Sequence, residues 1–402
     1  MSLLDHRALL AALCALSAGA CNALWGIGDL TYEEVSTPAG AGIAGSGGGD
    51  TTSSGGGGGG GGSGWWNTQW SRRIRIRLDN SARNEGLSNF PVPVVLDPAE
   101  VAILGARPDG SDLRAVSAHG ELMAHEIELW SLSSGGCVWV LVPAIEADSA
   151  AGFFWLYAGN DIAPSTEAPE AVWAGYRAVW HLNEPTVDEG AGLVHADATG
   201  NGNAGLQQGN ARQAPTDDTL GGSQSFDGVD DFIEVATTGL QLTGTALTLE
   251  ARAVAVAEPH DWPHVLGAGG DGRYWQIYWQ APGAGSVVGW VGTLRADGAR
   301  TVVAHEVAAL GSWHTLALVY DGAELGLYVD GELRDAAPLT GPLDALDSPL
   351  RIGDNPGLSP REFQGVIDEV RIADVARSAA WVEAQHDAHT GAMVTTGAVE
   401  AR

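Results

Sequence analysis

The stretch TLALVYDGAELGLYVDG, residues 315–331, decides the fold class of the larger part of this chain. Two apolar runs, 315–320 and 324–329, are each followed by an Asp-Gly pair. Asp-Gly next to apolar runs is the strongest short-range signal of a β-hairpin, because glycine accepts the positive φ of a tight turn. The first run is apolar on both faces, which is typical of a sheet covered on both sides. We therefore predict a β-sandwich around this hairpin.

Further strands are predicted on either side of the hairpin. Val179–Leu182 is an apolar run followed by a turn-rich loop at residues 197–203, and Ser225–Val235 contains a turn and a strand. Gln364–Ile372 supplies a late strand. Ser378 is placed to cap a short amphipathic helix that ends at about His386.

These pieces, in this order, resemble the LamG type of concanavalin A-like jelly roll, over residues 173–381. The landmarks that carry the resemblance are Trp180–Glu184, Thr199-Gly200-Asn201, Phe226-Asp227-Gly228, Tyr328–Gly331 and Ile367–Arg371. The resemblance implies a jelly-roll domain at residues 173–390. It does not decide the function, since this fold serves sugar binding, protein adhesion and hydrolysis alike.

A separate β domain is predicted at residues 65–162. Residues 72–78 alternate charged and apolar side chains, as a half-buried strand does, and 91–96, 137–142 and 153–157 read as more buried strands. The segment resembles a bacterial family known as domain of unknown function 2341. The resemblance lies in Trp70–Ile74, Phe90-Pro91-Val92, Asp109–Arg114, Glu126–Trp130, Val138-Trp139-Val140 and Tyr157–Asn160. The expected fold class is thus all-β, with two β-sandwich domains.

The N-terminal residues predict export. An apolar run, residues 8–16, is too short to span a bilayer but suits the core of a signal peptide at residues 1–20. Ala18-Gly19-Ala20-Cys21 resembles a bacterial lipobox, in which Cys21 becomes lipidated; ordinary cleavage after Ala20 is the alternative. We expect an outer-membrane or cell-surface lipoprotein, or else a secreted protein, with the membrane reached only through Cys21.

Composition predicts the remaining segments and restricts the partners. Residues 21–64 include eight consecutive glycines and form a tether without a core, residues 163–172 are a linker, and residues 391–402 are a tail. Fifty acidic residues face twenty arginines, a formal charge of −30. Such a charge repels phosphate backbones, so nucleic acid is excluded as a partner.

A calcium site is the first candidate. Ca²⁺ takes six to eight oxygen ligands, and many members of the concanavalin A-like superfamily hold it with the first and last strands. The resemblance implies Glu184 and Asp368 as ligands, with Asp197 and Asn203 adding oxygens. In the alternative interpretation, Asp197 only shapes a turn and Asp368 only bonds neighbouring backbone amides.

An aromatic binding face is the second candidate. Residues 274–279 alternate, so Trp275, Ile277 and Trp279 point to one side and the other side presents Tyr274, Gln276 and Tyr278. Tyrosine rings stack on sugar C–H surfaces while amides hydrogen-bond hydroxyls. The alternative is that both faces are packed, with the tyrosines at the rim of the core.

Catalytic patterns are weaker. No Glu-x-Asp-x-x-Glu strand motif occurs in residues 173–381. Glu126 and Glu128 share one strand face but are interpreted as a solvated edge. The pair His260 and His264 is flanked by prolines that prevent a helix, and the remaining pair, His386 with His389, is only a weak metal signal.

The sequence therefore favours a non-catalytic cell-surface binding or adhesion protein whose sandwich recognises a polysaccharide or a surface protein. A structural envelope protein without a small ligand is the alternative, and a glycoside hydrolase is the third. The sequence leaves open the ligand, the oligomeric state and the role of residues 65–162.

Overall fold

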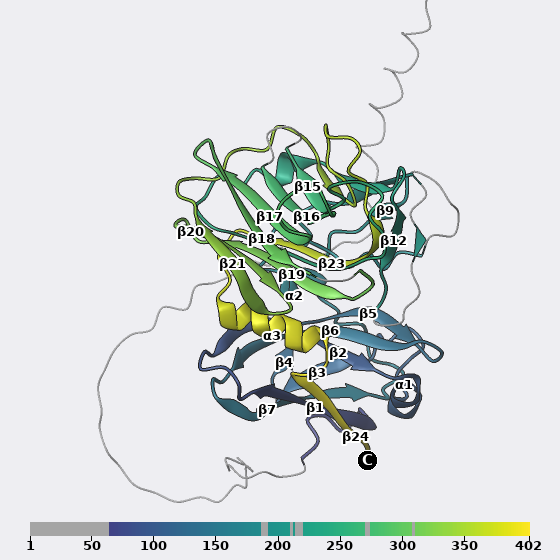
Figure 1. Ribbon diagram of the computed structural model, residues 1–402. Coiled ribbons are helices and arrows are strands. Elements are labelled where there is room, and N and C mark those ends of the chain that lie inside the picture. The colour runs from purple at the N-terminus through teal and green to yellow at the C-terminus, as the bar shows by residue number, and fades with distance from the viewer. Residues whose placement is uncertain (1–63, 186–191, 210–211, 214–219, 270–273, 308–309) are drawn as a thin grey trace, which may run out of the picture. The chain divides into compact units, whose positions relative to one another are not determined.

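The computed structural model describes residues 64–185, 192–209, 212–213, 220–269, 274–307 and 310–402 (Figure 1). The expected signal peptide, Cys21 and nearly all of the expected tether lie outside the described residues. Among the described residues, no helix is long and apolar enough to cross a bilayer.

The first sandwich consists of a five-stranded and a three-stranded sheet. The larger has the order β24 (Val394–Ala401), β1 (Arg72–Asn80), β7 (Ser149–Ala158), β3 (Arg114–Ser117) and β4 (Leu122–Met123). The smaller has the order β2 (Leu87–Leu96), β6 (Gly135–Ile145) and β5 (His125–Ser131). Helix α1 (Pro98–Leu104) begins with a capping box, in which Asp97 accepts from the backbone of Glu100 and Glu100 accepts from that of Asp97.

The second sandwich consists of two eight-stranded sheets. One has the order β18 (Ala299–Glu306), β17 (Gly289–Ala296), β16 (Trp275–Gln280), β15 (His264–Ala268), β22 (Leu350–Ile352), β13 (Phe232–Val235), β10 (Gly205–Gln208) and β9 (Val194–His195). The other has the order β11 (Arg212–Gln213), β12 (Gln224–Asp227), β23 (Gln364–Ala373), β14 (Leu247–Ala255), β19 (His314–Tyr320), β20 (Glu324–Val329) and β21 (Glu332–Pro338), and β8 (Ala178–Trp180) also pairs with β23. A short 3₁₀ helix, η1, covers Thr237–Gly239.

The predicted hairpin is present. Strands β19 and β20 pair antiparallel, and β20 turns into β21 through Asp330 and Gly331, which have φ of 55° and 79°. Two consecutive residues at positive φ are what a two-residue hairpin turn requires. The all-β prediction and the sandwich are confirmed, and the core between the two sheets includes Trp180, Trp275 and Trp290.

The expected tail at residues 391–402 is wrong. Strand β24 occupies most of it and pairs with β1 at the edge of the first sandwich, Val394 opposite Leu78 and Ala401 opposite Arg72. In Figure 1 this yellow strand lies beside the dark β1. The chain therefore returns to its first sandwich after completing the second.

Helix α3 (Ala379–His389) lies where the two sandwiches meet (Figure 1). Ser378 caps it as predicted, accepting from the backbone N–H of Trp381. The Trp381 ring packs edge-on against Phe90 of the first sandwich, with the centroids 4.8 Å apart. Val382 packs against Ala317 of the second sandwich. One helix therefore contributes to the cores of both sandwiches. Helix α2 (Pro169–Val172) lies within the predicted linker.

Candidate functional site

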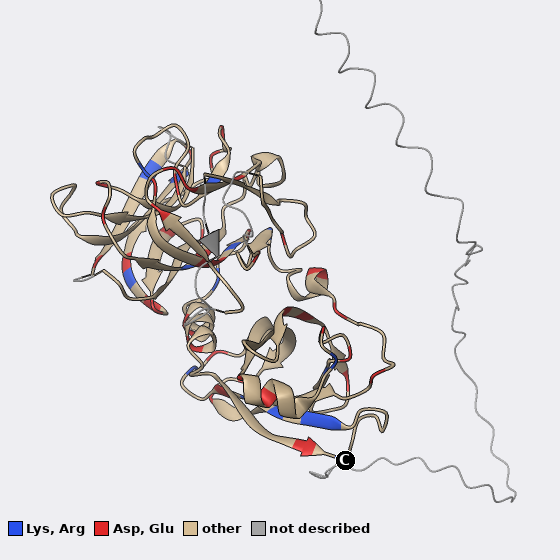
Figure 2. Ribbon diagram, turned by 90° about the vertical axis from the view of Figure 1, so that its right-hand side faces the viewer, with Lys and Arg blue, Asp and Glu red and all other residues tan. Residues whose placement is uncertain are grey.

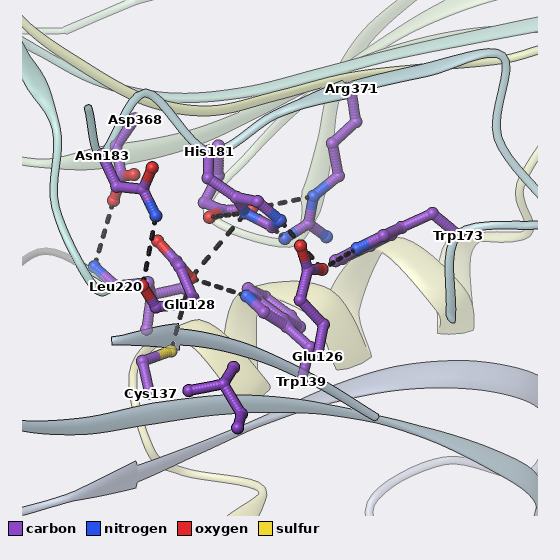
Figure 3. A network of polar contacts seen from close by, with 12 residues as sticks. Glu126, Glu128, Cys137, Trp139, Trp173, His181, Asn183, Leu220, Asp368 and Arg371 are labelled. Carbon is purple, nitrogen blue, oxygen red and sulfur yellow. Dashed lines mark hydrogen bonds and ion pairs between the residues drawn. The ribbon is translucent and has the colours of Figure 1, made fainter. Parts of the chain in front are cut away.

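A buried group of charged side chains lies where the sandwiches meet, and it is called here the junction cluster. Its members come from β5, from the residue after β8, and from β23 (Figure 3). They are Glu126, Glu128, His181, Asp368, Glu369 and Arg371.

Local backbone irregularities place these side chains. Strand β5 shifts register against β6 between Ile127 and Leu129, next to Glu128. Strand β23 shifts register where it passes Asp368 and Glu369, and Glu369 has a φ of 52°. Leu182, directly after His181, has a φ of 59°. Positive φ is uncommon outside glycine, and such strained residues cluster at functional sites.

His181 is the centre of the cluster (Figure 3). Its Nδ1 lies 2.7 Å from Glu369 Oε1 and 3.7 Å from Glu128 Oε2. Its Nε2 lies 3.2 Å from Glu126 Oε2. One imidazole therefore contacts three carboxylates, two from the first sandwich and one from the second.

Each carboxylate is also held by a second partner. The Trp139 indole N–H donates to Glu128 Oε2 at 2.7 Å, and the Trp173 indole N–H donates to Glu126. The Arg371 Nε donates to Glu369 Oε2 at 3.1 Å, and the guanidinium lies 4.5 Å over the Trp139 ring. These contacts fix the side-chain orientations before any ligand arrives.

The junction cluster contains four carboxyl groups but only one histidine and one arginine. Burial raises the pKa of Glu128 well above its usual range, and burial raises that of Asp368 to about 8 against the opposing effect of Arg252. Burial alone would lower the pKa of His181, but Glu369, Glu128 and Glu126 raise it well above its usual value. Burial thus shifts the pKa of Glu128 towards the protonated form, and the surrounding carboxylates shift the pKa of His181 in the same direction.

A cavity of 280 Å³ opens onto the cluster. Glu126, Glu128 and His181 line it on one side, together with Asn183, whose amide donates to the Glu128 carbonyl at 3.3 Å. Among the described residues, Glu128 Oε1 has no hydrogen-bond partner although its side chain is 0% exposed.

The expected calcium ligands are not brought together as one set. Glu184 and Asp197 line the same cavity, but Glu184 accepts from His195 Nδ1 at 2.7 Å and from the backbone N–H of Ala196. Asp197 accepts from the backbone N–H groups of Thr199 and Asn203, which is the turn-shaping role given as the alternative.

The other two expected ligands are engaged elsewhere. The Asn203 amide donates to the Arg177 carbonyl at 2.8 Å. Asp368 Oδ2 accepts from Arg252 at 2.9 Å and from the backbone N–H of Leu220 at 3.2 Å. Within the described part of the chain, two groups of three acidic or histidine side chains have ligand atoms close together. One group is Glu128, His181 and Glu369, and the other is Asp227, Asp230 and Asp231.

The three residues of the predicted tyrosine face do not form an open row, because Tyr274 packs against the core and Gln276 is covered. Trp275 and Ile277 lie in the core as the alternation requires, so Gln276 points to the outer side of the sheet. Tyr274 and Tyr278 are half-buried, whereas Gln276 is only 2% exposed. The Tyr278 ring stacks on His264, with the centroids 4.8 Å apart.

Polar groups gather around Gln276 on this outer side. Thr293 pairs with Gln276 on the neighbouring strand, and Gly267 pairs with it on the other side. A Cβ at Gly267 would lie 2.9 Å from the Asn355 side chain, so Asn355 lies directly over this glycine. Gln276 Nε2, Thr293 Oγ1 and both amide atoms of Asn355 have no hydrogen-bond partner within the described residues. We call Gln276, Thr293, Asp354 and Asn355 the polar face.

A cavity of 440 Å³ reaches the polar face at Asp354 and Asn355. Arg351 and Phe232 line it, and the guanidinium lies 4.0 Å over the ring. Arg351 donates to Asp354 Oδ2 at 2.7 Å, while Asp354 Oδ1 has no partner among the described residues. The cavity therefore offers an aromatic ring with its face covered by arginine, and several free polar atoms.

The junction cluster is what the sequence interpretation missed. Glu126 and Glu128 were expected at a solvated edge, and this is wrong because both are buried against His181 of the other sandwich. Two carboxylates on one strand face and a histidine in the Trp-His-Leu-Asn-Glu opening were the available signals. The histidine pairs have separate partners: His260 faces Glu362 at 3.1 Å, and His386 bonds Thr315.

Comparison with known families agrees with the two sandwiches. Residues 227–383 match the family described as the concanavalin A-like lectin/glucanases superfamily, and residues 109–183 match the domain of unknown function DUF2341. No curated protein matches the sequence.

Several solved structures are similar at low identity. The binding domain of Paraclostridial mosquitocidal protein 1 is 12% identical over 50% of this chain and 52% of its own, with a TM-score of 0.40. Domain 4 of the extracellular arabinanase AbnA from Geobacillus stearothermophilus, in complex with arabinotriose, is 15% identical over 52% of this chain and 96% of its own, with a TM-score of 0.41. The receptor-binding domain of the botulinum neurotoxin C/D mosaic serotype is 10% identical over 53% and 51%, with a TM-score of 0.42. The chain thus spans about half the length of the toxin chains.

The predicted order of the two families is confirmed: this chain carries a DUF2341 segment followed by a concanavalin A-like lectin/glucanase jelly-roll domain.

Proposed function

We propose that this chain is a non-catalytic binding protein whose second sandwich recognises a polysaccharide at the polar face. The lectin-type fold supports a binding role in general. The observation that carries the ligand class is the set of buried polar atoms without partners on Gln276, Thr293, Asp354 and Asn355.

Free energy explains why these atoms point to a ligand. A buried polar group without a partner costs about 1–3 kcal/mol, and native proteins pair the great majority of such groups. A ligand that offers both hydrogen-bond donors and acceptors would satisfy several of these unpaired groups at once. Sugar hydroxyls supply both donors and acceptors. Ordered water would satisfy the same atoms, so the experiment has to distinguish a bound glycan from water alone.

Asn355→Ala is the sharpest variant, because Asn355 is buried, lines the cavity and carries two atoms without partners. The wild-type protein is screened on an array of cell-wall and capsular glycans, and the affinity of any bound glycan is measured by calorimetry. We expect Asn355→Ala to weaken that affinity about tenfold or more, since the ligand leaves polar groups unpaired. Gln241→Ala, at an exposed amide of the same sandwich, is the matched control and keeps full affinity.

The proposal fails if the wild-type protein retains no glycan, or if Asn355→Ala binds as tightly as wild type. Blank arrays would favour the structural envelope protein, which needs no small ligand. Release of reducing sugar from a retained glycan would favour the glycoside hydrolase.

Surface attachment completes this proposal. Cys21 would carry the lipid, and residues 21–64 would hold the folded part away from the membrane. We expect Cys21→Ala to move the protein from the membrane fraction to the medium or periplasm. Mass spectrometry of the mature N-terminus checks this, and an unmodified Ala20 cleavage product in the wild type would show secretion instead.

Calcium at Glu184, Asp197, Asn203 and Asp368 remains a proposal. Its support is that Glu184 and Asp197 line one acidic cavity. Its weakness is geometric, because Asp368 already pairs with a guanidinium. Addition of Ca²⁺ alone to the chelator-treated protein tests it, and an unchanged melting temperature would exclude calcium.

A further inference from the structure

We propose that Glu128, His181 and Glu369 form a binding site for a transition-metal dication of the Zn²⁺ type at the junction of the two sandwiches. None of these residues belongs to the polar face, so the site is independent of the proposed glycan binding. It would couple the two sandwiches through one ion.

The ligand atoms are already close to the required geometry. One ligand atom from each of the three residues lies within 4.8 Å of the others, and two of the separations are 2.7 and 3.7 Å. Ligand distances of about 2.1 Å place the donors of a tetrahedral zinc roughly 3.4 Å apart. Small side-chain shifts are therefore sufficient to bring the three atoms around one ion.

Each ligand has its own orienting partner, as metal ligands do in proteins. Glu126 lies on His181 Nε2, so Nδ1, which contacts Glu369 Oε1 at 2.7 Å in this structure, is the nitrogen that would bind the ion after losing its proton. Trp139 and Arg371 hold Glu128 and Glu369 respectively. Figure 3 shows Glu126, Trp139 and Arg371 next to His181 and Glu128. A carboxylate on the far nitrogen of a ligating histidine fixes its tautomer and strengthens it as a ligand.

A second observation points to a cation. Glu128 Oε1 is fully buried and has no partner among the described residues. Glu128 and His181 also line the 280 Å³ cavity, which provides an entry route and room for a water as the fourth ligand. Asp368 and Glu369 are adjacent, fully buried carboxyl groups of the same cluster. A buried carboxylate without a partner is costly, and a bound dication removes that cost.

The donor set decides the kind of metal. Ca²⁺ and Mg²⁺ take oxygen ligands, whereas a set of one imidazole and two carboxylates suits Zn²⁺ and related ions. Three protein ligands leave one position open to water, unlike the four protein ligands of a closed structural zinc site.

The test uses the purified protein, stripped with EDTA and exchanged into chelator-free buffer. Calorimetry and thermal unfolding are followed on addition of Zn²⁺ alone, or Ca²⁺ alone. We expect one Zn²⁺ per chain and a higher melting temperature. Glu128→Gln, which keeps the shape and removes the charge, is expected to weaken zinc binding by more than about 100-fold, and Glu126→Gln by about 10–100-fold.

Asp230→Asn is the matched control, because Asp230 belongs to an acidic group at the surface of the second sandwich. It is expected to bind zinc as tightly as wild type. Cobalt added to the unmodified protein gives a readout that needs no variant, since a Co²⁺ ion in this site has intense visible d–d absorption that zinc abolishes. Absence of a stoichiometric zinc site, zinc binding that survives Glu128→Gln, or displacement of zinc by equimolar Ca²⁺ would each overturn the proposal.

Discussion

Asp330 shows how one residue combines turn geometry with charge. It sits in the β20–β21 turn at a φ of 55°, its Oδ2 lies 2.8 Å from His314 Nδ1, and its Oδ1 accepts from the backbone N–H of Thr315. Burial alone would raise the pKa of Asp330, but the hydrogen bond and charge of His314 lower it. The ionised carboxylate therefore stabilises the folded state.

This carries a pH-dependent prediction. Because the folded pKa of Asp330 lies below its unfolded value, its stabilisation is present above the unfolded pKa and is lost as the pH falls through the folded one. Asn tolerates the same turn conformation, so Asp330→Asn removes the charge without straining the backbone. We expect it to lower the free energy of unfolding by about 1 kcal/mol at pH 7, and by less at pH 3, which lies below the unfolded pKa of an aspartate. Urea unfolding at both pH values measures it.

Asp161→Asn, at an exposed aspartate of the first sandwich, is the control and should leave stability unchanged at both pH values. An Asp330→Asn penalty that is the same at pH 3 and pH 7 would contradict the ionic explanation and leave only the turn geometry.

Residue-level prediction succeeded where the cause was local. The alternation at residues 274–279 correctly separated Trp275 and Ile277 from Gln276. It could not show that Gln276 is covered, because residues distant in sequence, such as Asn355 over the neighbouring Gly267, pack on this side of the sheet. Glu128 was misread for the same reason: its burial depends on His181, which belongs to the other sandwich.

At the scale of elements, short-range signals gave reliable strands and caps. The Asp-Gly turns, the Ser378 cap and the strand at residues 364–372 are all present, because each depends on residues adjacent in sequence. Strand β24 was missed because its partner β1 lies at the far end of the described chain. None of its residues is fully buried, and only Val394 and Val399 pack against the first core once β1 lies beside the strand.

The sequence predicted helix α3, but it did not predict that the helix packs on both sandwiches. Its Trp381 and Val382 are neighbours in sequence, yet one packs on the first sandwich and the other on the second. A helix with two apolar contact surfaces has a weak amphipathic pattern, which hides its position between two domains. Gln385 of the same helix accepts from Arg371 Nη1 at 3.0 Å, so the helix also supports the junction cluster.

At the scale of the whole molecule, arginines form ion pairs with some of the many carboxylates. Arg73 of β1 contacts Glu400 of β24 at 2.7 Å, and Figure 2 shows blue colour on a strand close to the C-terminus. Arg73 also lies 3.8 Å over the Trp155 ring. Arginine suits these positions because its planar guanidinium pairs with a carboxylate and stacks on an aromatic ring at once.

The return of the chain to its first sandwich predicts that the two sandwiches depend on each other. Removing residues 392–402 deletes Met393 from the first core and leaves β1 as an unpaired edge. Loss of the buried methionine alone costs about 2–5 kcal/mol. We expect the intact protein to unfold in one transition and the shortened chain in two, with the first sandwich melting earlier. Calorimetry resolves the transitions, and tryptophan fluorescence reports on both sandwiches. Thr395→Ala, at an exposed position of β24, should keep the single transition. A shortened chain that still unfolds in one transition at the original temperature would mean that β24 contributes nothing to the stability of the first sandwich.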